Sequence, residues 1–246
     1  LQHKGSGLFG VPAYFKIGHM PIRVANGLFY SHTRFNDDAI VLGIEPIKGF
    51  NVDFAYVKNA ENNIILDDDA DTYSLMLNYQ IAKNSKIGAD VSYFRQQNGG
   101  SSYYTTSSNP LVTVPAPNTD LWNFGLNAKT DLGLKGLELA FDGAYQTGKM
   151  QDNPYSSGQD VDLEGWAMTF DASYNFDPVK VTLGFGYGSG QDDEIAPGKE
   201  MKNKTFQTSL ESIPHYTFIY EYFTPNAANT TNGGLQNTWY LKLKAA

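Results

Sequence analysis

The sequence predicts an all-β chain that folds as an antiparallel, up-and-down transmembrane β-barrel. Three observations lead to this prediction. Apolar and polar residues alternate with period two in many successive segments, the segments are about 9 to 12 residues long, and short and long connections alternate between them. Soluble strands average about 5 to 6 residues, whereas tilted strands of about 9 to 11 residues cross a bilayer. The segment length therefore favours strands that span a membrane.

The alternating segments follow one another along most of the chain. In 50–56, for example, Phe50, Val52, Phe54 and Tyr56 alternate with polar or small residues. We expect ten strands, at about 13–23, 38–46, 50–56, 73–81, 87–93, 122–128, 137–145, 166–174, 181–187 and 239–243. Together they form one domain over residues 1–246.

The connections fall into two length classes. The short ones are expected at 46–49, 83–85, 131–136 and 177–179, and the long ones at 59–71, 97–119, 147–163 and 189–235. Outer-membrane barrels have short periplasmic turns and long external loops. We therefore expect the long connections, above all the loop 189–235, to be external and both ends of the chain to be periplasmic.

Aromatic residues make up 14% of the chain and gather near the ends of the apolar sides of the predicted strands. They are Phe50, Tyr56, Tyr73, Tyr79, Tyr93, Trp122, Tyr145, Trp166, Tyr174, Tyr187 and Trp239. Such girdles are typical of membrane barrels. A soluble β-sandwich also alternates, but its strands are shorter and its loops lack this regular pattern. A β-helix would have a fixed short repeat, and the sequence has none.

Composition excludes several other classes. No stretch approaches the ~18 to 20 consecutive apolar residues that a spanning helix needs. The mean hydropathy of −0.38 is compatible with a barrel whose inner side chains are polar. The chain has no cysteine, so it has no disulfide framework. A net charge of −8 and a pI near 4.9 argue against nucleic-acid binding.

The alternation assigns each side chain to lipid or to the barrel interior. Phe54, Leu77, Phe124, Phe141 and Phe170 should face lipid, and Asp53, Asn78, Asn127, Asp142 and Asp171 should face inward. The candidate pore-lining charges are Lys16, Asp53, Asp90, Lys129, Glu138, Asp142, Asp171 and Lys242, with Lys244 beside them. Inward acids outnumber inward bases, which predicts a weak cation preference at low salt. Pairing of these charges across the wall is the alternative.

Small inward residues accompany these charges, and together they suggest a wet interior wide enough for solute. They are Gly88, Gly125, Ala140, Ala144, Gly184 and Gly186. The glycines of 184–188 alternate with aromatics on a strand, so close packing or a narrow wall explains them better than a nucleotide-binding loop.

One acidic cluster is a candidate calcium site. Asp67, Asp69 and Asp71 lie in a predicted external loop, and carboxylates are ligands suited to Ca²⁺. Their spacing does not match the EF-hand pattern, and a solvated acidic loop is the alternative. No other cofactor is predicted.

The histidines give little support to catalysis. His3, His19, His32 and His215 lie in no recognisable nucleophile or zinc motif. A barrel protease would need histidine and acidic groups together at the external rim, and His32 with Asp37 and Asp38 is the only such candidate. The sequence therefore predicts that the protein is not an enzyme.

Five stretches carry a family resemblance: 16–22 (KIGHMPI), 26–29 (NGLF), 35–40 (FNDDAI), 186–193 (GYGSGQDD) and 234–237 (GLQN). With them, the chain resembles the alginate-export-like family of outer-membrane porins. The resemblance implies a barrel of about 16 to 18 strands, so that residues 1–246 would be incomplete at both ends. It also implies passive passage of solutes, in some members an anionic polysaccharide. The exporter has an arginine-rich lumen, which this chain lacks, and His19 stands where many relatives have arginine.

We therefore expect a porin of the bacterial outer membrane that passes small hydrophilic solutes. The partners implied are membrane lipid, lipopolysaccharide and the solutes, with a homo-oligomer left open. A polysaccharide exporter, a barrel enzyme acting at the outer surface and a structural barrel within a larger complex are the alternatives.

Overall fold

The computed structural model describes residues 2–8, 10–60, 69–97, 118–153, 159–190, 201–208, 235 and 237–246. These residues form one sheet of twelve strands and contain no helix. Within them, no helix is long and apolar enough to cross a membrane.

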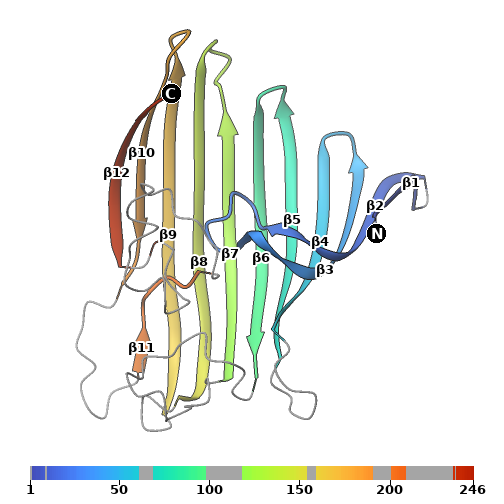
Figure 1. The fold of residues 1–246 in the computed structure, drawn as a ribbon, viewed down its shortest axis with the longest axis vertical. Helices are drawn as coiled ribbons and strands as arrows, with labels where there is room; N and C mark the ends of the chain where they lie inside the picture. Colours follow the sequence, from blue (N-terminus) through green and yellow to red (C-terminus); the bar gives the residue numbers. More distant parts are fainter. Residues whose placement is uncertain are drawn as a thin grey trace.

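The strands run in chain order across the sheet (Figure 1). They are β1 (Gln2–Leu8), β2 (Val11–Arg23), β3 (Ser31–Ile47), β4 (Phe50–Ala60), β5 (Ala70–Ala82), β6 (Ser85–Gln96), β7 (Asn118–Thr130), β8 (Leu137–Asn153), β9 (Gln159–Asn175), β10 (Lys180–Gly188), β11 (Met201–Asn203) and β12 (Thr238–Ala245). Consecutive strands from β1 to β10 pair antiparallel, β10 pairs with β12, and β11 lies parallel to β9. The ten predicted strands are confirmed, and β1 and β11 are added to them.

The short turns lie where the sequence predicts them and gather at one end of the sheet (Figure 1). Neighbouring turns are tied together: Asn84 donates to the Asp131 carboxylate at 2.7 Å. This hydrogen bond, with one from the backbone of Gly133, holds the pKa of Asp131 below its usual value. Most residues of the predicted long connections 59–71, 97–119 and 189–235 lie outside the described residues. The long connection predicted at 147–163 is wrong over most of its length, because β8 continues to Asn153 and β9 begins at Gln159.

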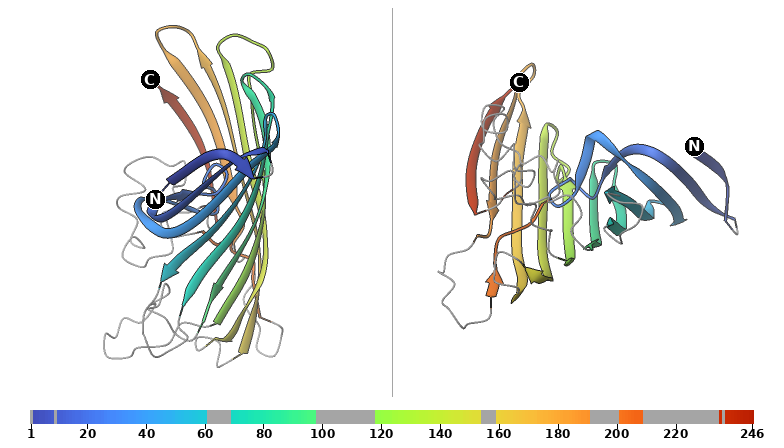
Figure 2. Two further views of the ribbon diagram at one scale, coloured as in Figure 1. Left: turned by 90° about the vertical axis from the view of Figure 1, so that its right-hand side faces the viewer. Right: turned by 60° about the horizontal axis from the view of Figure 1, so that its bottom comes forward.

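The sheet curves strongly, and its first strands bend over one of its faces (Figure 2). The described sheet is not closed, because β1 and β12 are its two edge strands and pair with one neighbour each. The predicted up-and-down antiparallel sheet is therefore confirmed in the described residues, and the closed barrel stays a prediction.

The two faces of the sheet differ in chemistry. We call the face that carries Phe54, Leu77, Phe124, Phe141 and Phe170 the outer face; these five side chains are all exposed. The opposite, concave face is the inner face, where Asn127 and Asp142 are buried and Asp53, Asn78 and Asp171 half-buried. The facing predicted for all ten residues agrees with this arrangement, so the register is the one that the alternation requires.

Two segments of the chain fold back onto the inner face. The first is 24–30, between β2 and β3, which crosses in front of β6 to β8 (Figure 1). The second is 204–207, which follows β11. Their apolar side chains join inner-face residues of the sheet in one buried cluster: Ile22, Val24, Leu28, Phe29, Tyr30, Ala39, Val41, Ala55, Val57, Leu121, Met150, Val161, Leu163, Ala167, Phe206 and Leu235. The hydrophobic core therefore lies between the sheet and these segments.

Candidate functional site: the inner face

All eight residues predicted to line a pore lie on the inner face. The pairing register demonstrates this, because directly paired residues on neighbouring strands share a face. Asp53 of β4 pairs with Met76, Met76 with Asp90, and Asp90 with Gly125. Lys129 and Asp171 both pair with Ala140. The alternation in the sequence thus assigns these eight side chains to the correct face of the sheet.

Four of these eight charges form ion pairs within the wall. Lys129 lies 2.9 Å from Glu138, and Lys180 lies 3.5 Å from the same carboxylate. Lys242 lies 3.0 Å from Asp171, with both side chains about three-quarters or more covered. Charge pairing, the alternative left open by the sequence, therefore accounts for this end of the inner face, near the short turns.

A row of polar side chains crosses the middle of the inner face. The hydroxyls of Ser74 and Ser92 are 2.9 Å apart, and Asn123 donates to Asp90 at 3.4 Å. Gln146 continues the row by donating to Asn123 at 3.2 Å. Because all these side chains except Asp90 are at most 1% exposed, their hydrogen bonds have to be supplied by neighbours, and the row supplies them.

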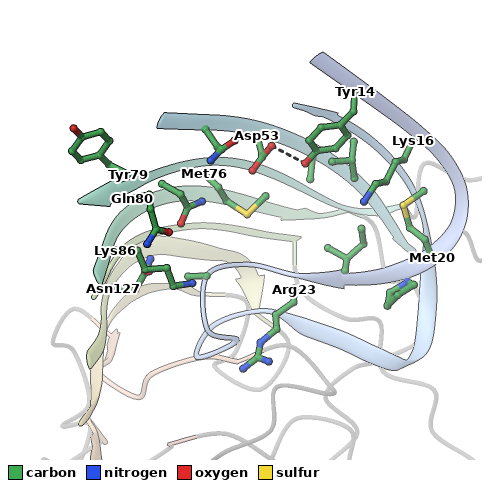
Figure 3. A pocket seen from close by; sticks show the side chains of 17 residues that line it. Tyr14, Lys16, Met20, Arg23, Asp53, Met76, Tyr79, Gln80, Lys86 and Asn127 are labelled. Carbon is green, nitrogen blue, oxygen red and sulfur yellow. Dashed lines mark hydrogen bonds between the residues drawn. The ribbon is translucent and has the colours of Figure 1, made fainter. Parts of the chain in front are cut away.

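A cavity of about 460 Å³ opens beside this row (Figure 3). Tyr14 donates to Asp53 at 2.7 Å on its wall, and the Lys16 ammonium lies 5.1 Å from the Tyr14 ring. Arg23 and Lys86 also line it, and neither was among the predicted pore-lining residues. Lys86 could have been found, because it alternates with the outward Ile87, whereas Arg23 follows a register shift after Met20.

Segment 24–30 is anchored to the far side of the inner face by Asp142. The backbone N–H groups of Asn26 and Leu28 donate to this carboxylate, and the Arg23 guanidinium attracts it. Asp142 is buried on β8, and five strands lie between β8 and β2, at whose end the segment begins. The segment therefore spans the inner face rather than extending beyond the sheet.

The other end of the segment is fixed by a buried polar cluster. Tyr30 donates to Asp37 at 2.8 Å and stacks on His32 with ring centroids 4.5 Å apart. His32 Nδ1 lies 2.8 Å from Asp37, and Asn59 donates to the Tyr30 hydroxyl at 2.5 Å. The predicted His32 and Asp37 pair is thus present, but both side chains are buried in this cluster, which leaves a polypeptide substrate no access to them.

Asp38, the third member of that candidate protease group, does not join it. Its side chain lies on the outer face, exposed, with its carboxylate 3.1 Å from His19. The three residues therefore do not converge on one site.

Segment 204–207 packs against the sheet at Gly165 of β9, which has no side chain. A Cβ atom on Gly165 would lie 2.8 Å from Cα of Phe206, so glycine is required for this approach. The Phe206 side chain is fully buried. Ser189 fixes the start of the segment by donating to the carbonyl of Lys204 at 2.7 Å.

Other inward glycines make room for neighbouring side chains rather than for solute. The Asp90 carboxylate occupies the space beside Gly125, Asp171 and Lys242 that beside Gly184, and Tyr240 that beside Gly186. This is the close packing predicted for Gly184 and Gly186. It corrects the expectation that these small residues widen the interior.

The candidate calcium ligands are engaged by a lysine. Lys58 lies 2.5 Å from Asp69 and 3.6 Å from Asp71, so its ammonium occupies the place that a cation would take. Asp67 lies outside the described residues. Among the residues that the structure describes, no group of three or more metal-binding side chains occurs.

Aromatic rings form a row on the outer face near the long connections. Tyr56, Tyr73, Tyr93 and Trp122 are consecutive partners on β4 to β7, with neighbouring centroids 4.7–6.3 Å apart. The hydroxyl of Tyr56 donates to Asp71 at 2.9 Å, and that of Tyr93 donates to Asp120. The polar tips thus point away from the apolar middle of the face.

A second aromatic group lies at the opposite end of the outer face. Tyr79 packs against Phe50 and Tyr174 against Phe176, with centroids 6.4 and 4.7 Å apart. Tyr73 and Tyr79 of β5 are separated by about 20 Å at about 3.3 Å per residue. Apolar side chains fill the outer face between the two groups.

No protein-family model matches this chain, and no curated protein is found to be similar to it.

Proposed function

We propose that this chain forms the wall of a β-barrel channel in a bacterial outer membrane, through which small hydrophilic solutes diffuse. One observation carries the proposal: from β2 to β12 the outer face exposes large apolar side chains, while the inner face is polar. The exposed set includes Ile17, Leu42, Phe54, Leu75, Leu77, Ile87, Phe124, Leu126, Phe141, Phe170, Leu183 and Leu241. A continuous apolar surface of this extent is unfavourable in water and stable in lipid.

The height of the apolar band supports a membrane rather than a protein partner. Its two aromatic groups lie about 20 Å apart along β5, from Tyr73 to Tyr79. Membrane barrels carry an apolar band about 25 Å tall between two aromatic girdles. The tyrosine hydroxyls that donate to Asp71 and Asp120 would then lie at the water side of one girdle.

Lipid also requires that the sheet close. Backbone N–H and C=O groups at an open edge in lipid have no water to bond, so β1 and β12 need partners there. Further strands beyond the twelve would supply them, which agrees with the 16 to 18 strands that the alginate-export-like resemblance implies.

The polar inner face would line the channel, and the two inward segments would narrow it. Segment 24–30, anchored at Asp142, and segment 204–207, held at Gln146, both occupy space on the inner side. The cavity beside Tyr14 and Asp53 would be part of the remaining path for solute.

Ion conductance across a planar lipid bilayer tests the proposal. The protein, folded in detergent, should insert as discrete, stable current steps that persist at low voltage, and the same protein boiled in SDS should give none. Insertion without current would overturn the channel and favour a structural barrel. A fully buffer-soluble protein would overturn the membrane location as well.

Export of an anionic polysaccharide is a second candidate, which one observation favours. Lys16, Arg23 and Lys86 line the same cavity, against Asp53 as the acidic residue there. Anionic oligosaccharides added to one side of the bilayer would then block the current reversibly, whereas neutral oligosaccharides of the same length would not.

A further inference from the structure

The outer face carries a row of nine neighbouring titratable residues, of which the eight from Asp38 onward alternate in sign. His19 pairs with Asp38, Asp38 with Lys58, and Lys58 with Asp71. The row continues through Arg95, Asp120, Lys149, Asp162 and Lys202. Each of these residues is the direct cross-strand partner of the next, so the row runs unbroken from β2 to β11.

The charge row lies beside the aromatic row, two residues further along each strand toward the long connections. Lys58 follows Tyr56 by two residues on β4, Asp71 precedes Tyr73 on β5, and Arg95 follows Tyr93 on β6. Residues two apart on a strand share a face. The charges therefore lie on the same side of the sheet as the apolar band, directly past its aromatic edge and toward the long connections.

The row is more than a set of internal ion pairs. Within it, His19 with Asp38 and Lys58 with Asp71 are in ion-pair contact, while Lys149 pairs with Asp160 outside the row. Asp120, beside Arg95 in the register, accepts from the Tyr93 hydroxyl. The exposed Arg95 guanidinium takes part in none of the ion pairs between residues that the structure describes.

We propose that this charge row contacts the phosphate groups of the lipid headgroup layer, with Arg95 and Lys149 as principal phosphate ligands. The proposal rests on the membrane location proposed above and deepens it. Past the aromatic girdle, the surface meets headgroups rather than acyl chains. A planar guanidinium binds a phosphate through two parallel hydrogen bonds, and an ammonium binds it as a point charge.

The spacing of the row suits a layer of separate anionic groups. Lys58, Arg95 and Lys149 stand on every second strand, so neighbouring cations are about 9.5 Å apart. The carboxylates between them keep the row near neutrality. Individual phosphates can therefore bind at single cations. The row as a whole is nearly neutral and does not attract anions over a long range.

Lipid binding to the folded protein in detergent micelles tests the inference. The probes are diphosphorylated lipid A and the same glycolipid with both phosphates removed, and native mass spectrometry measures the bound fraction. Arg95→Gln should weaken binding of the phosphorylated lipid about fivefold, and Arg95→Gln with Lys149→Gln about 25-fold. These factors assume that each cation near an anionic lipid surface contributes about equally to the binding free energy. Binding of the dephosphorylated lipid should not change.

Lys135→Gln is the matched control, because Lys135 is an exposed cation in the short turn at the opposite end of the sheet. It should leave binding unchanged. Heat-modifiable gel mobility establishes that each variant is folded, and Lys149→Gln alone keeps the test open if Arg95→Gln does not fold.

Two results separate failure of this inference from failure of the proposed function. An Arg95→Gln or Lys149→Gln variant that folds and inserts but binds phosphorylated lipid as tightly as the wild type and Lys135→Gln do overturns the headgroup contact alone. A wild-type protein that does not enter micelles or bilayers overturns both.

Discussion

The side-chain amide of Gln146 on β8 holds the backbone of Gln207 by two hydrogen bonds of opposite direction. Its Oε1 accepts from the Gln207 N–H and its Nε2 donates to the Gln207 carbonyl, each at 2.7 Å. Gln146 is 1% exposed, so water cannot reach its amide to replace either hydrogen bond. The polar wall of the sheet thus fixes the position of segment 204–207.

Gln146→Met should release this segment. Methionine has nearly the same volume but cannot pair with the two backbone groups, and each buried polar group left unpaired costs about 1 to 3 kcal/mol. We expect a lower urea midpoint for unfolding in micelles. Gln151→Met, at an exposed position of the same strand, is the control and should not change it. Equal midpoints for both variants would contradict the role of Gln146.

Segment 24–30 should reduce the current through the channel. Arg23 and Ser31 are direct partners in the β2–β3 pairing, so an Asn-Gly turn in place of residues 24–30 can join the two strands. Because the segment crosses the inner face to Asp142, its removal should raise single-channel conductance. A conductance equal to that of the wild type would mean that the segment lies outside the solute path.

The strands were predictable because their signal is local. In β4 to β9, alternation alone determines the face of each side chain, and the turns such as 83–84 and 131–136 fall where the alternation stops. β1 was not predicted because Gln2–Leu8 is polar and glycine-rich, and its apolar and polar residues do not alternate with period two. β11 has three residues, too few for any period to be recognised.

The inward segments could not be predicted, because their contacts are distant in sequence. Asn26 bonds to Asp142 and Gln207 bonds to Gln146. The local sequence of either segment does not identify these partners. The eight predicted charges of the inner face were found by alternation. Their pairing, for example Lys242 with Asp171, depends on which strands are neighbours and therefore required the structure.

Leu77→Arg should destabilise the protein in lipid. Leu77 lies in the middle of the outer face, and an arginine at the bilayer midplane costs roughly 2 to 4 kcal/mol. Asn78→Arg, one residue further on the inner face, should cost much less because its side chain remains on the polar side. Unfolding by urea in phospholipid vesicles measures both. Similar stabilities for the two variants would argue that the outer face meets water.

Ion selectivity should be weak, with neither sign clearly preferred. The acids Asp53, Asp90 and Asp142 are matched in number by Lys16, Arg23 and Lys86, which offsets the weak cation preference that the predicted charges alone imply. Screening over about 8 Å at ~0.15 M salt should remove what remains. Lys86→Gln should shift the reversal potential across a salt gradient toward cations. Clear anion selectivity of the wild type would instead favour anionic polysaccharide export.

Accessibility along β5 tests the central claim most directly. The chain has no cysteine, so spin labels can be attached to single cysteines at 73–80 without background. In lipid vesicles, labels at Tyr73, Leu75, Leu77 and Tyr79 should be reached by oxygen dissolved in the bilayer. Those at Ser74, Met76, Asn78 and Gln80 should be shielded from it. A period-two alternation of oxygen access is the predicted result. Uniform access of a water-soluble nickel complex to both sets would contradict a sheet whose outer face lies in lipid.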